Sequence, residues 1–266
     1  MKDLYRRLPT TAVLIVFAYA VIRFLPALPF LGVLYLIIAG ASLELLRLTA
    51  PKKKGVLLIL ANGLVLGAAF AYPLFPMTVA MFWVLFSSGI YLLFALRERE
   101  LLPYFVRDFG IHLLAAFYLF FPLYFLFELK KISPNHLFFL IFVIAVGDSG
   151  AYFVGSAVGR HKIYPLASPK KSLEGLVAAV ITAGLAGWLS FLLFPVSVSP
   201  WLAVVTGGLI GLVSQLSDPV ESLFKRAAGQ KDSGSLLPGH GGLLDRLDSY
   251  VFCAPLLFFI VTYVWK

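Results

Sequence analysis

The sequence predicts an all-α, polytopic integral membrane protein with about nine transmembrane helices and no soluble domain. First, 61% of the 266 residues are hydrophobic and the mean hydropathy is +0.93, so charged side chains are too few to cover a soluble surface. Second, long apolar runs recur along the whole chain, whereas the short alternating segments of a membrane barrel are absent from the sequence. Third, the longest polar stretch, 218–246, is too short and too rich in glycine and serine to build its own core.

Apolar windows of about 20 residues, the length that crosses about 30 Å of hydrocarbon, define the expected spans in order. They fall near 9–25, 28–46, 55–72, 76–95, 110–127, 135–156, 173–194, 200–217 and 247–265. The fifth and sixth windows contain Pro122 and the stretch Gly147–Gly150, where we expect a kink or a break. Basic residues precede the first window, but no clear cleavage site follows, so we expect this helix to be retained.

The basic residues predict the orientation of these helices. Nine spans put the N-terminus and the loops near 47–54, 96–109, 157–172 and 218–246 on one side of the membrane, together with 18 of the 22 lysines and arginines. Only four fall on the opposite side: Arg23, Lys130, Lys131 and Lys266. Because basic loops stay inside the cell, we expect a cytoplasmic N-terminus in an inner (plasma) membrane protein.

The chain divides by character into two parts. Residues 1–109 carry N-terminal helices and basic loops, and residues 110–266 form the expected catalytic bundle, which includes the loop 218–246. Within the second part, small residues recur every four positions, so one face of each helix allows close backbone approach. These stripes are Gly147, Ala151, Gly155 and Gly159; Gly175, Ala179, Ala183 and Gly187; and Ala203, Gly207 and Gly211. We expect a tightly packed bundle, and a surface-lying or solvated segment at 96–109.

Acidic residues near apolar segments are the first candidates for chemistry, because a carboxylate in hydrocarbon is costly without a partner. Asp148 lies within the sixth window, Asp218 ends the eighth, and Asp245 and Asp248 open the ninth, three residues apart and so on one helical face. Three carboxylates at one membrane face favour a hard cation such as Mg²⁺, which binds one or two carboxylates together with water and phosphate. The alternative is simple ion pairing with Arg246, Lys225 or Lys231.

Basic and glycine residues surround these acids. The loop region contributes Lys225, Arg226, Lys231 and His240 with five glycines, and Lys170 and Lys171 precede the seventh span. Glycine lets backbone N–H groups approach an anion, and lysine binds phosphate as a point charge. For Lys170 and Lys171 alone, positive-inside topology and anionic lipid attraction are the better explanation of the charge.

Carboxylates with Mg²⁺ and basic side chains indicate phosphoryl or nucleotidyl transfer. The sequence has no Walker A loop and no Gly-x-Ser-x-Gly motif, which excludes P-loop NTPases and serine hydrolases of that type. The net charge of +9 would suggest nucleic acid for a soluble protein; here we expect anionic lipid and phosphorylated substrates, and no nucleic acid.

The run SLFKRAAGQKDSGSLLPGHGGLLDRLD, from Ser222 to Asp248, resembles the signature of the phosphatidate cytidylyltransferase (CDP-diacylglycerol synthase) family. The matching positions are Ser222, Lys225, Arg226, Lys231, Asp232, Pro238, His240, Gly241, Gly242, Asp245, Arg246 and Asp248. The earlier runs GDSGAYFVGSAVGR and SPKKSLEG also resemble family segments in the expected order. The N-terminal half resembles the family only in its helical character.

The resemblance implies that CTP and phosphatidate react to give CDP-diacylglycerol and pyrophosphate, with Mg²⁺ and a second cation possible. It implies direct attack of a phosphatidate oxygen on the α-phosphorus of CTP at the cytoplasmic face, in a homodimer. Asp218, Asp245 and Asp248 would hold the metal. Lys225, Arg226, Lys231 and Arg246 would neutralise the triphosphate. The substrates would contact Lys170, Lys171, Ser222, His240, Gly241, Gly242 and Asp148.

Other classes of protein stay open. The nearest are other lipid-phosphate enzymes: a CTP-dependent polyprenol kinase, a CDP-alcohol phosphotransferase, whose longer aspartate pattern the sequence does not match, or a sugar-phosphate transferase. An ion-coupled transporter would use Asp148, Asp218 and Asp245 as cation sites, but transporters place such acids near the bilayer midplane rather than beside a basic loop.

Overall fold

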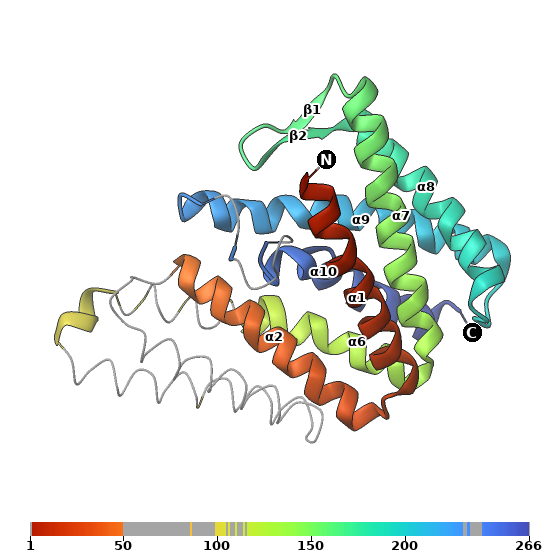
Figure 1. Cartoon of the computed structure of the whole chain (residues 1–266), viewed down its shortest axis with the longest axis horizontal. Coiled ribbons are helices and arrows are strands. Elements are labelled where there is room, and N and C mark those ends of the chain that lie inside the picture. Colours follow the sequence, from red (N-terminus) through yellow and green to blue (C-terminus); the bar gives the residue numbers. More distant parts are fainter. Residues whose placement is uncertain are drawn as a thin grey trace.

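The computed structural model describes residues 2–49, 86, 99–104, 106, 110, 114, 116–230, 233–234 and 241–265. The expected span 55–72, all of 76–95 except residue 86, half of 96–109, and the signature residues Lys231, Asp232, Pro238 and His240 lie outside this part. The described chain is predominantly helical, as predicted (Figure 1). A short β-hairpin between two of its helices is the one departure from an all-α fold among the described residues.

The helices of the described chain are α1 (Lys2–Phe24), α2 (Ala27–Thr49), α6 (Phe121–Ile132), α7 (Pro134–Val158), α8 (Leu173–Leu193), α9 (Pro200–Ala227) and α10 (Leu244–Tyr263). A 3₁₀ segment covers Arg99–Tyr104 and a π-helical turn covers Ala116–Phe120. Strands β1 (Lys162–Tyr164) and β2 (Ser168–Ser172) pair antiparallel with an irregularity between the paired positions Lys162–Ser172 and Tyr164–Ser168. This hairpin lies in the predicted loop 157–172 and no strand was predicted there.

Four helical segments of the described part are long and apolar enough to cross a membrane, which supports a membrane-embedded protein. They are Ala27–Leu45, Pro134–Val158, Leu173–Leu193 and Pro200–Ala227. Helix α1 contributes a shorter apolar segment, Ala12–Phe24. The predicted total of nine spans therefore stays a prediction.

Serine–proline and serine caps start several helices where the sequence changes from loop to apolar helix. The Ser133 hydroxyl accepts the Asn135 N–H (3.3 Å) at the start of α7, and the Ser199 hydroxyl accepts the Leu202 N–H (3.4 Å) at the start of α9, with proline at the first helical position in both. Such caps satisfy N–H groups that have no partner within the helix. Ser172, the last residue of β2, caps α8 by accepting the Gly175 N–H (3.2 Å).

Helices α7, α8 and α9 pack through the predicted small-residue stripes. A Cβ added at Gly207 would lie 2.3 Å from the Ala183 carbonyl oxygen, and one at Gly187 would lie 2.2 Å from the Ala203 carbonyl oxygen. At the α7–α8 contact, a Cβ added at Gly175 would lie 2.9 Å from the Ala151 carbonyl oxygen. Because no side chain fits between these backbones, the stripes set the distance between the helices.

Two of the expected features at prolines and glycines have different outcomes. The chain changes from a π-helical turn to α6 at Phe121, directly before Pro122, so the expected irregularity is present. Helix α7, in contrast, runs unbroken from Pro134 to Val158 through Gly147–Gly150. These glycines serve close packing: a Cβ at Gly147 would lie 3.2 Å from the Ala183 Cβ, and one at Gly150 would overlap Thr182.

Helix α9 is ten residues longer than the predicted span 200–217, and it continues through Pro219 to Ala227. The prediction that Asp218 ends this helix is therefore wrong. The sequence prediction placed the helix end too early, because the charged residues after Asp218 end the apolar window but do not end the helix. As a result Ser222, Lys225 and Arg226 project from a rigid helix rather than from a loop.

Candidate active site

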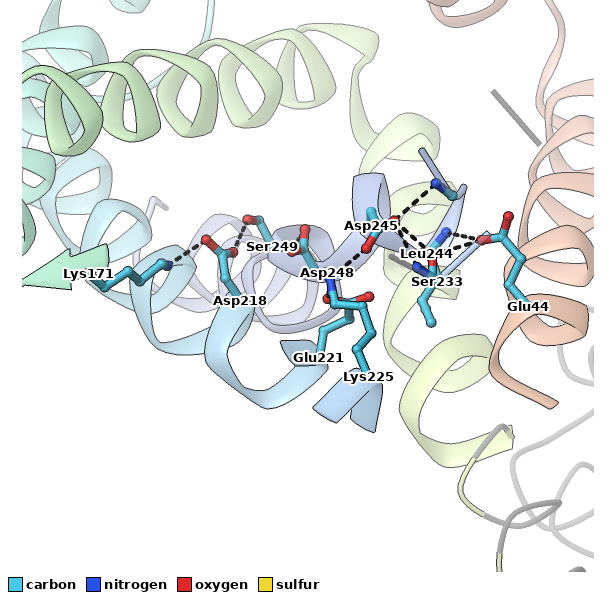
Figure 2. Close-up of polar contacts among 11 residues, drawn as sticks. Glu44, Lys171, Asp218, Glu221, Lys225, Ser233, Leu244, Asp245, Asp248 and Ser249 are labelled. Carbon is cyan, nitrogen blue, oxygen red and sulfur yellow. Dashed lines mark hydrogen bonds and ion pairs between the residues drawn. The ribbon is translucent and has the colours of Figure 1, made fainter. Parts of the chain in front are cut away.

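Acidic and basic side chains from three segments form a row of polar contacts where α9 ends and α10 begins (Figure 2). Helix α9 contributes Asp218, Glu221 and Lys225, helix α10 contributes Asp245, Asp248 and Ser249, and strand β2 contributes Lys171. Lys171 and Asp218 are 47 residues apart in sequence, and Asp218 and Ser249 are 31 residues apart. They meet because α8 and α10 both pack on α9. Five of the residues that the sequence singled out lie in this row: Lys171, Asp218, Lys225, Asp245 and Asp248.

Asp218 connects α9 with both neighbouring segments. Its Oδ2 lies 2.5 Å from the Lys171 ammonium, and its Oδ1 accepts a hydrogen bond from the Ser249 hydroxyl at 2.8 Å. The Lys171 ammonium also donates to the Gln215 carbonyl oxygen at 3.3 Å. Of the two lysines predicted on this segment, Lys171 points into the site, whereas the Lys170 side chain is exposed. Alternation of side chains along β2 explains this difference.

Lys225 bridges two carboxylates. Its ammonium lies 2.6 Å from Asp245 Oδ1 and 2.5 Å from Glu221 Oε2, and its side chain is 13% exposed. Glu221 is fully buried, and within the described residues the ion pair with Lys225 compensates the burial of its charge. Ion pairing with Lys225, the alternative expected for Asp245, is thus present, and Asp218 forms an ion pair with Lys171 that the sequence did not predict.

Asp245 is held by the signature segment as well as by Lys225. Its Oδ2 accepts hydrogen bonds from the Gly242 N–H (3.0 Å), the Ser233 N–H (3.2 Å) and the Ser233 hydroxyl (2.9 Å). Burial raises the pKa of the Asp245 carboxyl, but the hydrogen bonds from Lys225 and the Gly242 N–H outweigh it, so this pKa lies below its usual range. Asp245 is therefore anionic at neutral pH and fixed in one orientation.

Along the row, Asp248 lies between the Asp218–Lys171 pair and the Asp245–Lys225 pair (Figure 2). Its Oδ1 accepts the Ser249 N–H at 2.8 Å, and its backbone carbonyl accepts the Ser217 hydroxyl of α9. Within the described residues, no ion pair is formed by Asp248 itself. Asp148 lies on α7, and its Oδ1 accepts a hydrogen bond from the side-chain amide of Gln215 on α9 at 2.8 Å.

The remaining predicted residues take different positions. Arg226 and Arg246 are exposed on α9 and α10, and Ser222 is half-buried on α9. Gly241 has a φ of +84°, a left-handed conformation that favours glycine, and Gly242 is buried beside Asp245. Lys231 and His240 lie outside the described residues.

Sequence reasoning missed several residues that build the site. Glu221 stands four positions before Lys225 on a helix, a spacing that pairs opposite charges, so it was predictable once α9 was extended. Ser233 and Ser249 are small hydroxyl residues without a sequence signal of their own. Glu44 of α2, whose carboxylate contacts the signature segment, lies in an apolar helix nearly 200 positions away in sequence.

The donor set fits a hard cation. Asp218 and Asp248 flank Ser249, whose hydroxyl and N–H hold one oxygen of each carboxylate, and oxygen ligands suit Mg²⁺. In the described part of the chain, no group of three or more histidine, cysteine, aspartate or glutamate side chains has a metal-binding arrangement. Mg²⁺ commonly binds one or two carboxylates and completes its shell with water and phosphate, so Asp218 and Asp248 would supply enough carboxylates to hold it.

Apolar helices long enough to cross a membrane surround a site of paired acids and lysines, and this arrangement is typical of a membrane-embedded protein. Comparison with known proteins gives the family. The family model described as "Cytidylyltransferase family" matches residues 5–264. The phosphatidate cytidylyltransferase of Bacillus subtilis (strain 168) is 31% identical over 98% of each chain. The chain belongs to the cytidylyltransferase family.

Two staphylococcal relatives align over a shorter region. The phosphatidate cytidylyltransferase of Staphylococcus saprophyticus is 38% identical over 133 residues, and that of Staphylococcus aureus (strain COL) is 35% identical over 133 residues. In both alignments the chain spans about half the length of the curated relative: 50% of this chain and 51% of the relative are covered.

Proposed function

We propose that this protein is a phosphatidate cytidylyltransferase, which makes CDP-diacylglycerol and pyrophosphate from CTP and phosphatidate. One observation carries the proposal. Lys225 and Asp245, which belong to the family signature, lie in the same row of polar contacts as Asp218 and Lys171. The names of the relatives support the same reaction, most fully the Bacillus subtilis protein, which aligns over 98% of its length.

The proposed reaction needs no protein nucleophile. A phosphate oxygen of phosphatidate attacks the α-phosphorus of CTP, the bond from this phosphorus to the oxygen that bridges it to the β-phosphorus breaks, and pyrophosphate leaves with that oxygen. Catalysis of such a displacement depends on positioning and on neutralising negative charge. A site that holds lysine ammonium groups in fixed places beside a bundle of apolar helices meets both needs.

Basic residues supply that neutralisation. Lys225 and Lys171 are placed by carboxylates, so their ammonium groups are already desolvated and oriented when a phosphate arrives. Arg226, Lys231 and Arg246 would contact the triphosphate and the leaving group. Lys170 and Lys171 would contact the phosphatidate headgroup or the nucleotide. Ser222, His240, Gly241, Gly242 and Asp148 are proposed to line the substrate site.

Asp218, Asp245 and Asp248 are the proposed ligands of Mg²⁺, with a second cation possible. Bound there, Mg²⁺ would supply positive charge to the phosphate oxygens and orient them. Each of Asp218 and Asp245 has one oxygen on a lysine, and a triphosphate that attracts that lysine would leave this oxygen available.

The proposed setting is the inner (plasma) membrane, with the N-terminus and the active site on the cytoplasmic face, where CTP is found. We expect a homodimer. No nucleic acid is expected, because the basic residues have lipid and phosphate partners in this setting.

The test uses purified protein in detergent micelles with phosphatidate, Mg²⁺ and CTP labelled in its cytosine ring. We expect label to enter the lipid extract only when phosphatidate is present and to be lost when EDTA removes the metal. Asp245→Asn is the matched variant and is expected to lower the rate at least about 100-fold, because it removes one negative charge from the proposed metal site. Failure of the wild-type protein to label the lipid across a range of detergents and divalent metals would contradict the proposal.

A further inference from the structure

Glu44 is a buried acid in the N-terminal half of the chain, which carries no part of the family signature. It lies on the apolar helix α2, and its side chain is 1% exposed. Burial of a carboxylate is costly unless hydrogen bonds compensate it. Its compensation comes from the other half of the molecule: Glu44 Oε2 accepts the Leu244 N–H at 2.8 Å and the Ser233 hydroxyl at 3.1 Å.

The first of these contacts caps helix α10. Leu243, the residue before this helix, forms no side-chain cap, so the first N–H groups of α10 need partners from elsewhere. Glu44 accepts the N–H of Leu244 and places negative charge at the positive end of the helix dipole. Helix α10 therefore starts where α2 holds it, and Asp245 is the next residue.

The second contact connects Glu44 directly with Asp245. The Ser233 hydroxyl lies 3.1 Å from Glu44 Oε2 and 2.9 Å from Asp245 Oδ2, so one side chain touches both carboxylates (Figure 2). Ser233 is itself buried, with 5% of its surface exposed. A shift of the Glu44 carboxylate would thus move both the helix start and the hydroxyl that orient Asp245.

Two glycines of the signature region leave room for this carboxylate. A Cβ added at Gly234 would lie 2.5 Å from Glu44 Oε1, and one added at Gly242 would lie 2.6 Å from Glu44 Oε2 and 1.9 Å from the Ser233 hydroxyl oxygen. On the α2 side, a Cβ added at Gly40 would lie 2.8 Å from the Leu243 side chain. The fit is close from both sides, as expected of a contact that fixes position.

We propose that Glu44 is a positioning residue for the active site: by capping α10 and sharing Ser233 with Asp245, it holds this aspartate in its working orientation. The inference rests on the proposed cytidylyl transfer, and it extends the site to a helix that the signature does not include. Glu44 itself touches neither substrate nor reacting atoms.

The test compares Glu44→Ala and Glu44→Gln by steady-state kinetics, with kcat and the KM for CTP measured separately. Glu44→Ala is expected to lower kcat about 10- to 100-fold, the usual cost of a misplaced reactive group, with a smaller change in KM. Glu44→Gln is expected to keep kcat within about 3-fold of wild type, because an amide oxygen in the place of Oε2 accepts the Leu244 N–H and lies beside the Ser233 hydroxyl. Glu128→Ala is the control, since this acid pairs with Lys131 on α6, away from the row.

A purely structural role predicts lower thermal stability with normal kcat per folded molecule, and a kcat for Glu44→Ala within 2-fold of wild type would overturn the proposal. Equal impairment of Glu44→Gln and Glu44→Ala would overturn the hydrogen-bonding role. If Glu44→Ala yields no folded protein, Ser233→Ala takes its place: we expect reduced kcat at near-normal stability, and an unchanged kcat counts against the proposal.

Hydrogen exchange separates failure of this inference from failure of the proposed function. The backbone amides of residues 241–247 are expected to exchange faster in Glu44→Ala than in wild type and in the Glu128→Ala control. This readout needs no activity, so it applies even if the wild-type protein does not label phosphatidate. Unchanged exchange in this segment would contradict the capping role.

Discussion

At the scale of single residues, Lys225 and Arg226 give the clearest contrast, because they are neighbours with opposite surroundings. Lys225 lies between Glu221 and Asp245, whereas Arg226 is exposed. Lys225→Ala leaves the buried Glu221 without its cation, which is expected to cost about 3–5 kcal/mol of stability and to abolish activity. Arg226→Ala is expected to change stability by less than about 0.5 kcal/mol and to raise the KM for CTP.

Thermal unfolding in detergent and the KM for CTP measure these two effects. Equal stability of the two variants would show that the Glu221–Lys225–Asp245 contacts do not form. The sequence predicted Lys225 and Asp245 but left open whether they pair. It missed Glu221 because the carboxylate's burial depends on how α10 packs against α9, and this is a property of the tertiary structure.

At the scale of elements, strand β2 directs two neighbouring lysines differently, although the sequence analysis gave both the same role. Lys171 contacts Asp218, and the Lys170 side chain faces outward. We expect Lys171→Ala to reduce kcat/KM at least about 10-fold, the cost of one charge-assisted hydrogen bond, and Lys170→Ala to have a much smaller effect. The comparison uses kcat/KM for CTP and for phosphatidate. A larger loss for Lys170→Ala would contradict the arrangement of this strand.

The packing of helices α8 and α9 gives a second test at this scale. A Cβ at Gly207 would lie 2.3 Å from the Ala183 carbonyl oxygen, whereas a Cβ at the adjacent Gly208 would lie 3.6 Å from its nearest neighbours. Gly207→Ala is therefore expected to lower the free energy of unfolding by about 1–3 kcal/mol, and Gly208→Ala to leave it unchanged or slightly higher. Chemical unfolding in detergent measures the difference, and similar values for both would be inconsistent with this packing.

Apolar periodicity was enough to predict helices α7, α8 and α10 and the faces by which α7, α8 and α9 pack. It failed at the end of α9: the last ten residues of this helix include four charged residues, so a hydropathy window ends at 217 although the helix continues. It also missed the β-hairpin, whose three- and five-residue strands are too short for a periodic signal.

At the scale of the whole molecule, the two halves of the chain form one site, since Glu44 of α2 contacts Leu244 and Ser233. The sequence could not predict this contact, because the signature ends at Ser222 on one side and Asp248 on the other. An acidic residue in an apolar helix needs a hydrogen-bond or ion-pair partner, but the sequence does not indicate which residue is that partner.

The proposed orientation has its own test. Cys253 is the single cysteine and is buried, so Cys253→Ser provides a background for Lys131→Cys and Arg160→Cys. These two exposed positions flank α7: Lys131 is near the end of α6, and Arg160 follows α7. Basic loops stay inside the cell, so we expect an impermeant maleimide to label Lys131→Cys in intact cells and Arg160→Cys only after permeabilisation. The reverse pattern would invert the orientation and remove CTP from the site.

The most direct test of the central claim follows the phosphates of CTP. Purified protein is incubated with phosphatidate, Mg²⁺ and CTP labelled either at the α- or at the γ-phosphate, and the lipid is extracted. Cytidylyl transfer predicts that α-label enters the lipid and that γ-label is recovered only as pyrophosphate. Transfer of γ-label to lipid would identify a kinase, and label in lipid from neither form of CTP would contradict the account.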